Sequence, residues 1–403
     1  NNFYTPTVYE KGAELVRMLA GRLGPERFRK GTDRYFEAND GRAATIEDLL
    51  AALGEANGVD LTPYLAWYGR AGTPQLDAHW THDAANGSLE LTLTQRPPRG
   101  VEARLAPLPI PVKLALFGPD GRPQALTLEG RALGTETVLV LDSERATHRF
   151  EHVAADSVPS LLRGFSAPVV LTADYTPAQL ALLLRHDPDG FNQWEAGQRL
   201  AALAWEEVRD NAHTGAADAW CQALLEILAD TDFDGALLAD LMTPPSEIEL
   251  AEREAVVDPS RIHAFRESLL NRLAKYLGGS SLAMHYVRLD SAETGALDAA
   301  SQARRALKRC VLGLQARADK ETAFTLAAEQ AAKARTMTDR LAALGVLVRH
   351  RAPQAAEALA AFRARHADDP LALDKWFAVQ AQAPGERALA TVQALEADPA
   401  FTL

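Results

Sequence analysis

The sequence contains few cysteines and no long apolar stretch, and both absences limit what the protein can be. Its two cysteines, Cys221 and Cys310, lie in apolar helical patterns, so we expect buried, reduced thiols in a cytoplasmic protein. No cysteine or histidine cluster has the spacing of a zinc site. No run of about 18 apolar residues occurs, so no membrane partner is expected. The acidic, helix-patterned start does not read as a signal peptide.

Basic residues are outnumbered by acidic ones. The 403 residues include 42 Lys and Arg against 54 Asp and Glu, a formal net charge of −12. A nucleic-acid-binding surface needs a basic face, so we expect no nucleic-acid partner. The hydrophobic fraction of 47% is ordinary for a globular protein. Because this length is too great for one compact core, we predict two or three domains.

Residues 1–72 carry helical patterns. Thr7 with Glu10, and Thr45 with Asp48, have the spacing of capping boxes, and the first of them predicts a helix from Val8. The apolar side chains expected to face the core in this part are Leu15, Val16, Leu19, Leu23, Phe28, Tyr35 and Phe36.

The pattern changes twice along the rest of the chain. Over 73–174 the period is two, and "GPDG" at 118–121 is a turn between strands, so about seven short strands predict a β-sandwich. Over 175–403 Ala- and Leu-rich helical stretches alternate with Asp, Pro and Gly breaks, which favours a solenoid-like stack of helix pairs. The strands expected beyond those at 89–93 and 112–116 lie near 124–129, 136–141, 147–153 and 165–173.

No complete catalytic motif is present. The sequence has no Walker loop, no GxGxxG and no GxSxG. His79 and His82 point to opposite faces if they lie on a strand, so they do not share a metal easily. The stretch from Asp230 begins like a calcium loop, but Leu241 stands where the bidentate glutamate belongs, so we expect a helix turn in which Asp234 is the N-cap.

The opening stretch "NNFYTPTVYEKGAELVRML" resembles the segment that follows the zinc motif in the M1 family of zinc aminopeptidases. In that family the tyrosine of V-Y-E-K-G faces the active site. The resemblance continues in order along essentially the whole chain. The further similar stretches are "YFEANDGRAATIEDL" (35–49), "WYGRAGTP" (67–74), "LLRGFSAPV" (161–169), "RHDPDGFNQWEAGQRL" (185–200), "MTDRLAAL" (337–344) and "LDKWFAVQA" (373–381).

This resemblance implies three domains. They are the helical end of a thermolysin-like catalytic domain at 1–72, a β-sandwich at 73–174, and a helical, superhelical domain at 175–403 that is truncated at its C-terminus. The family's H-E-x-x-H and G-x-M-E-N motifs are absent here and precede V-Y-E-K-G in the family. We therefore expect part of a larger enzyme that acts on peptides. Its Zn²⁺ ligands are expected upstream of Asn1, in the N-terminal part of the same enzyme, so this chain alone should bind no zinc and be inactive.

The same resemblance assigns roles to three residues. Tyr9 would donate its hydroxyl hydrogen to the oxyanion of the reaction, Tyr4 would line the pocket for the first side chain of the substrate, and Asn1 would lie near that pocket. Without the resemblance, Tyr9 reads as a core residue that packs on Leu15 or Val16.

Two neighbouring residues and one alternative function complete these expectations. We expect Glu10 to be the capping partner of Thr7, and Lys11 to make a helix-surface or tertiary contact. The alternative function is a stand-alone helical-repeat module that binds proteins without catalysis. A retained V-Y-E-K-G segment favours the enzyme, because a scaffold does not need an oxyanion-binding tyrosine.

Overall fold

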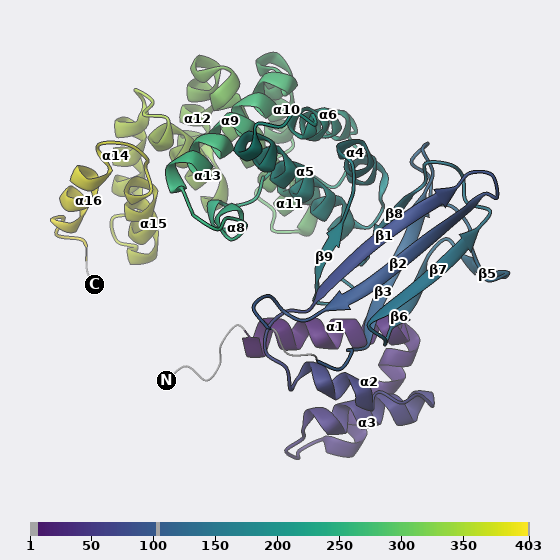
Figure 1. Ribbon diagram of the computed structural model, residues 1–403. Helices are drawn as coiled ribbons and strands as arrows, with labels where there is room; N and C mark the ends of the chain where they lie inside the picture. Colours follow the sequence, from purple (N-terminus) through teal and green to yellow (C-terminus); the bar gives the residue numbers. More distant parts are fainter. Residues whose placement is uncertain (1–6, 102–104, 402–403) are drawn as a thin grey trace. The chain divides into compact units, whose positions relative to one another are not determined.

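A computed structural model describes residues 7–101 and 105–401 of the chain (Figure 1). The chain packs into two compact units, one that ends at Arg199 and one that begins at Leu200. The division falls within one helix, Gly190–Asp210 (α5). No helix among the described residues is long and apolar enough to cross a membrane.

The first unit begins with helices. Thr45 caps α3 through a capping box with Asp48, as the sequence predicts. Pro25 opens α2 at a position where a missing N–H costs nothing. The helical elements of this part are a π-helix η1 (Thr7–Lys11), α1 (Gly12–Leu23), α2 (Pro25–Asn39), α3 (Ile46–Asn57) and a 3₁₀-helix η2 (Thr62–Trp67).

The helix predicted from Val8 is present: its first turn, Thr7–Lys11, is a π-helix, and the α-helix follows from Gly12. One expectation for these helices is wrong. Phe36 was expected in the core, but its ring is 64% exposed. Gly31 is the buried residue of α2 instead, and a Cβ there would lie 2.5 Å from Cδ2 of Leu53. Helices α2 and α3 therefore approach each other through a glycine rather than through aromatic rings.

In the described residues, nine strands in two sheets follow, which confirms the predicted β-sandwich. The larger sheet has the order β5-β4-β7-β2-β1-β9, with β9 parallel to β1, and the smaller has the order β6-β3-β8. The predicted turn closes with a hydrogen bond from Gly121 N to Gly118 O, 2.9 Å long. The strands are β1 (Gln75–Asp83), β2 (Ser88–Arg96), β3 (Ile110–Phe117), β4 (Leu126–Leu128), β5 (Arg131–Gly134), β6 (Thr137–Leu141), β7 (Arg145–Glu151), β8 (Val158–Leu161) and β9 (Val170–Ala173).

Alternation along the strands builds the core of the first unit. Leu89, Leu91 and Leu93 of β2 are fully buried, while the residues between them are more exposed. The same continuous cluster includes Leu15 and Leu19 of α1. Helix α1 and the strands therefore share one hydrophobic core, which fixes the start of α1 against the sandwich.

Helices make up the rest of the chain. Aspartates open many of them, and Asp234 accepts hydrogen bonds from Ala236 N and Leu237 N at 2.7 and 3.1 Å, which confirms the predicted cap. In the second unit, α11 packs against α7, α9, α10, α12 and α13. Besides α5, the helices are α4 (Pro177–His186), α6 (Ala216–Ala229), α7 (Gly235–Leu241), α8 (Glu247–Ala251), α9 (Pro259–Leu277), α10 (Gly279–Ser291), α11 (Ala299–Ala318), α12 (Lys320–Lys333), α13 (Met337–Arg349), α14 (Ala355–Arg365), α15 (Pro370–Ala381) and α16 (Ala388–Glu396).

Both cysteines are free thiols, as the sequence predicts. Cys221 is buried on α6, and Cys310 is half-buried on α11. Burial raises the pKa of each thiol to about 12. Because the thiolate is the nucleophilic form, neither cysteine is prepared for catalysis.

Candidate functional site

The segment "TVYEK" forms the π-helix η1, and this is where the sequence places the functional tyrosine. Single π-helical turns occur often at functional sites, because the extra residue changes the direction of the side chains. Tyr9 lies in this turn with its ring 61% exposed. The ring is therefore not part of the core that Leu15 and its neighbours form, and the core-packing interpretation of Tyr9 is wrong.

The other two predicted site residues, Tyr4 and Asn1, lie outside the described residues. The side chain of Thr7 also lies outside the described part, so the predicted capping pair of Thr7 with Glu10 stays a prediction. The side chain of Glu10 is exposed.

Lys11 holds the end of the π-helix against the loop before β1, which confirms the predicted tertiary contact. Its Nζ donates to the carbonyl oxygen of Gly72 at 2.9 Å and lies 3.5 Å from that of Arg70. Gly72 has a φ of +83°, in the left-handed region that glycine adopts without strain. The contact joins residues that are about 60 positions apart in the sequence. Lys11 follows Tyr9 by two positions, so the contact restrains the turn that carries the tyrosine.

A cavity of about 630 Å³ lies beside Lys11. Gln95 and Leu108 both line it, and two hydrogen bonds hold them together. The side-chain amide of Gln95 donates to Leu108 O at 3.0 Å and accepts from Leu108 N at 2.8 Å. Arg70 donates to the carbonyl oxygen of Ala106. The walls are formed by Lys11, Trp67, Arg70, Ala71, Gly72, Pro74, Gln95, Arg96, Pro97, Pro98, Leu105, Ala106, Pro107, Leu108 and Glu144.

This cavity can bind a ligand, but the described residues that line it include no nucleophile paired with a base. Proline and leucine side chains form much of its wall, and its charged members are three cations and Glu144. Sequence reasoning found Lys11 and the "WYGRAGTP" stretch at its edge but missed Gln95. The only available signal for Gln95 was an amide near the end of a predicted strand, which is too common to single out a residue.

The described residues do not form a metal site. No group of three or more His, Cys, Asp or Glu side chains in that part of the chain is placed to hold a metal ion. Nε2 of His82 lies 2.9 Å from the carbonyl oxygen of Ser157, while His79 is exposed on the same strand. Asp230 accepts from Asp232 N at 3.0 Å within the turn before α7. The described residues therefore do not fit a zinc ion.

Comparison with known families divides the chain into three matches. Residues 1–68 match the model described as peptidase family M1 domain. Residues 72–174 match a domain of unknown function (DUF3458) with an Ig-like fold. Residues 177–403 match a second domain of unknown function (DUF3458_C) with ARM repeats.

Similar proteins cover the whole chain. An aminopeptidase N of Caulobacter vibrioides is 39% identical over 410 residues, and one of Escherichia coli is 34% identical over 408. This chain spans 46% of the length of each. This chain is also similar to the crystal structure of Legionella pneumophila aminopeptidase A in complex with aspartic acid, with a TM-score of 0.85 and 26% sequence identity. The match covers 99% of this chain and 46% of the Legionella chain. With the family matches, these similarities show that the chain belongs to the M1 peptidase family.

Proposed function

We propose that this chain is part of an aminopeptidase that removes N-terminal residues from peptides, and that Tyr9 stabilises the oxyanion formed during the reaction. One observation carries the assignment of Tyr9. The residue lies exposed on a π-helical turn that Lys11 fastens to the carbonyl oxygen of Gly72. Relatives named aminopeptidase N support the activity. Because the chain spans less than half of their length, the activity belongs to the proposal for the whole protein.

Attack on a peptide carbonyl places negative charge on its oxygen. A hydroxyl group held at about 2.7–3.1 Å from that oxygen stabilises the charge more than it stabilises the substrate, and it therefore accelerates the reaction. The donor must keep its direction, because a donor that reorients during the reaction loses part of this advantage. The Lys11 contact supports such a fixed direction for the turn of Tyr9.

The remaining parts of the proposal rest on the family. Zinc would supply an activated water and polarise the carbonyl when bound, and its ligands belong to a part of the protein outside these residues. That part is also the expected partner of this chain. Tyr4 is proposed to line the pocket for the first side chain of the peptide, and Asn1 to lie near that pocket. A cytoplasmic location, with no nucleic-acid or membrane partner, remains an expectation from composition.

The proposal is tested with the complete protein that carries this sequence. We expect it to hydrolyse L-alanine p-nitroanilide but not the N-acetylated compound, because an aminopeptidase needs a free amino group. The 403-residue chain alone should hydrolyse neither and should hold no stoichiometric zinc after dialysis. Equal cleavage of both compounds by the complete protein, or cleavage of neither, contradicts the proposed function.

A further inference from the structure

Two oppositely charged side chains are buried together between α11 and α13. Lys308 is 1% exposed, and its Nζ donates to Oδ2 of Asp339 at 2.8 Å. The side chain of Asp339 is 2% exposed. A second carboxylate, that of Asp290 on α10, accepts from Lys308 at 3.0 Å and is half exposed. Buried charges are costly unless they are paired, so three helices are organised around this lysine.

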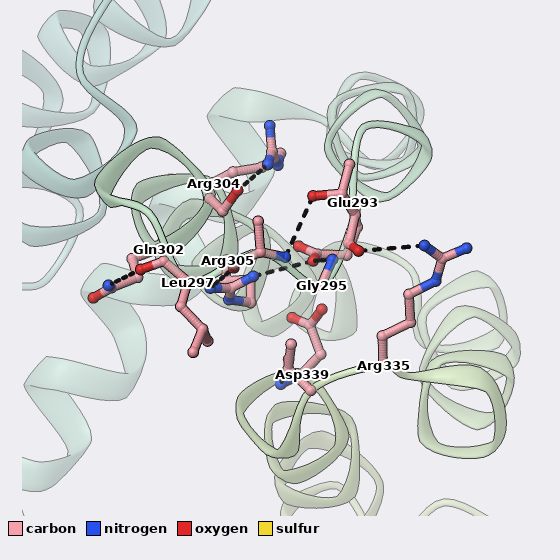
Figure 2. A network of polar contacts seen from close by, with 12 residues as sticks. Glu293, Gly295, Leu297, Gln302, Arg304, Arg305, Arg335 and Asp339 are labelled. Carbon is pink, nitrogen blue, oxygen red and sulfur yellow. Dashed lines mark hydrogen bonds and ion pairs between the residues drawn. The ribbon is translucent and has the colours of Figure 1, made fainter.

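A second buried pair stands one turn away on α11. Arg305 donates to Oε1 of Glu293 at 3.0 Å, and the two side chains are 4% and 7% exposed. Gly295 N also donates to Oε1, at 2.6 Å, and Arg305 donates to Ala296 O at 2.8 Å. Figure 2 shows the side chain of Asp339 pointing from α13 toward Gly295 and Arg305.

The second oxygen of Glu293 is left without a partner. Both hydrogen bonds to this carboxylate, from Gly295 N and from Arg305, go to Oε1. Oε2 is buried and accepts no hydrogen bond from any described residue. A buried carboxylate oxygen without a hydrogen-bond donor destabilises the fold, because it has lost its water and gained nothing in exchange. Glu293 lines a cavity of about 510 Å³. A donor in that cavity would remove the cost.

The cavity wall divides into two groups of charges. The first, which we name the acidic group, contains Glu293, Asp339, Lys308 and the half-exposed Asp290 of the wall. We count with it Arg305, which is not part of the wall but pairs with Glu293. Three carboxylates against two cations leave it one net negative charge. The acidic group therefore favours a ligand with a positive charge that can donate hydrogen bonds.

The second group, which we name the basic group, is formed by Glu329, Lys333 and Arg335. All three are exposed. Lys333 pairs with Glu329 at 3.3 Å, and Arg335 donates only a 3.3 Å hydrogen bond to Thr294 O among the contacts of the described residues (Figure 2). Two cations against one carboxylate leave one net positive charge on this exposed part of the cavity wall.

We infer that this cavity binds a small zwitterion, with an ammonium group at the acidic group and a carboxylate at the basic group; a free amino acid or a dipeptide has this chemistry. The ammonium supplies the donor that Oε2 of Glu293 lacks, and the guanidinium of Arg335 has unused donors for a carboxylate. Tyr286, Val287 and Leu326 form an apolar part of the cavity wall, against which the uncharged middle of the zwitterion would pack. A metal ion does not fit, because the described residues offer no group of three metal-binding side chains.

This inference goes beyond the proposed function, because it needs no catalysis by the chain. It is tested by isothermal titration of the 403-residue chain with L-alanyl-L-alanine, its N-acetyl derivative and its C-terminal amide. We expect the free dipeptide to bind, and each derivative to bind about tenfold or more weakly, because each lacks one of the two charges. Equal binding of the three compounds, or no binding of the dipeptide up to about 10 mM, overturns the inference.

Variants place the binding in this cavity. Arg335→Gln and Glu293→Gln should each weaken dipeptide binding about tenfold, while Glu357→Gln on α14 is the matched control and Tyr9→Phe should have no effect. Arg335 is exposed, so its variant should fold normally even if Glu293→Gln disturbs Arg305. Unchanged affinity in Arg335→Gln overturns the inference. Loss of binding in Tyr9→Phe instead would place the dipeptide at η1 and also overturn it.

Discussion

Nζ of Lys11 lies 2.9 Å from the carbonyl oxygen of Gly72, and this hydrogen bond joins the π-helix of Tyr9 to the loop that precedes the β-sandwich. The two residues are 61 positions apart. The π-helix continues directly into α1, whose buried face packs in the core of the first unit. Lys11 adds a point of attachment that is far away in the sequence.

Replacing Lys11 should disturb Tyr9 without removing it. We expect Lys11→Met in the complete protein to lower kcat about tenfold with little change in KM, because a displaced donor loses its advantage mainly in the transition state. Steady-state hydrolysis of L-alanine p-nitroanilide measures this. Lys30→Met, at an exposed position of α2, is the matched control. A normal kcat in Lys11→Met would show that the hydrogen bond does not position the turn.

The second prediction concerns a buried ion pair in the first unit. Nη1 of Arg163 donates to Asp187 at 2.6 Å, and Ser160 Oγ donates to the same carboxylate at 2.5 Å. Burial raises the pKa of Asp187 despite these partners. We expect Asp187→Asn to lower the free energy of unfolding by about 1–3 kcal/mol, because the buried Arg163 then keeps only Glu136, 2.8 Å from its Nε, as a counter-ion.

Denaturant unfolding of the first unit measures the loss for Asp187→Asn. Asp174→Asn, an exposed aspartate shortly before α4, should change the unfolding free energy by less than about 0.5 kcal/mol. The double variant Arg163→Met, Asp187→Leu should recover much of the stability, because neither charge is then buried alone. A double variant as unstable as the two single losses combined would contradict this explanation.

The third prediction is a pH dependence in the second unit. Arg317 of α11 binds Glu267 of α9 with two hydrogen bonds of 2.9 and 3.0 Å, and Arg349 of α13 adds one of 3.0 Å. Burial alone would raise the pKa of Glu267, but the two arginines outweigh it and the pKa lies below its ordinary value. A lowered pKa stabilises the fold above the unfolded value, near 4.3, and this stability disappears as pH falls.

Glu267→Gln should therefore cost about 1–3 kcal/mol of unfolding free energy at pH 7 and much less near pH 3. Thermal melts at the two pH values measure the difference. Glu357→Gln should show no such dependence. If Glu267→Gln lowers stability equally at both pH values, the ion pair is not the cause.

The fourth prediction concerns two glycines whose replacement by alanine should change the stability of the fold in opposite directions. A Cβ at Gly31 would lie 2.9 Å from Cα of Leu53, where backbone must move, whereas a Cβ at Gly21 of α1 meets nothing within 4 Å. We expect Gly31→Ala to destabilise by about 1–3 kcal/mol. Gly21→Ala should stabilise by about 0.5–1 kcal/mol, since alanine is the better helix former. A stabilising Gly31→Ala, measured by thermal melting, would contradict the close approach of α2 to α3.

Local patterns predicted the elements well. The capping pair of Thr45 with Asp48 and the N-cap at Asp234 depend on residues two or three positions apart, so both are visible in the sequence. The alternating leucines of β2 likewise report one buried face. These features could be predicted because each depends only on residues that are close together in the sequence.

Features decided by tertiary packing were missed. Phe36 is exposed because a glycine, not an aromatic ring, fills the contact between α2 and α3. The cavity around Glu293 gathers side chains from α10, α11, α12 and α13. A charged residue on any one of these helices looks like an ordinary solvated residue, so no pattern in the sequence could indicate that they meet.

Whether Tyr9 donates a hydrogen bond to the oxyanion is decided by the variant Tyr9→Phe in the complete enzyme. The change removes one hydroxyl and keeps the ring. We predict that kcat for L-alanine p-nitroanilide falls by about two to three orders of magnitude, while KM, zinc content and melting temperature stay near those of the unaltered enzyme. A near-normal kcat would show that Tyr9 is not the oxyanion donor.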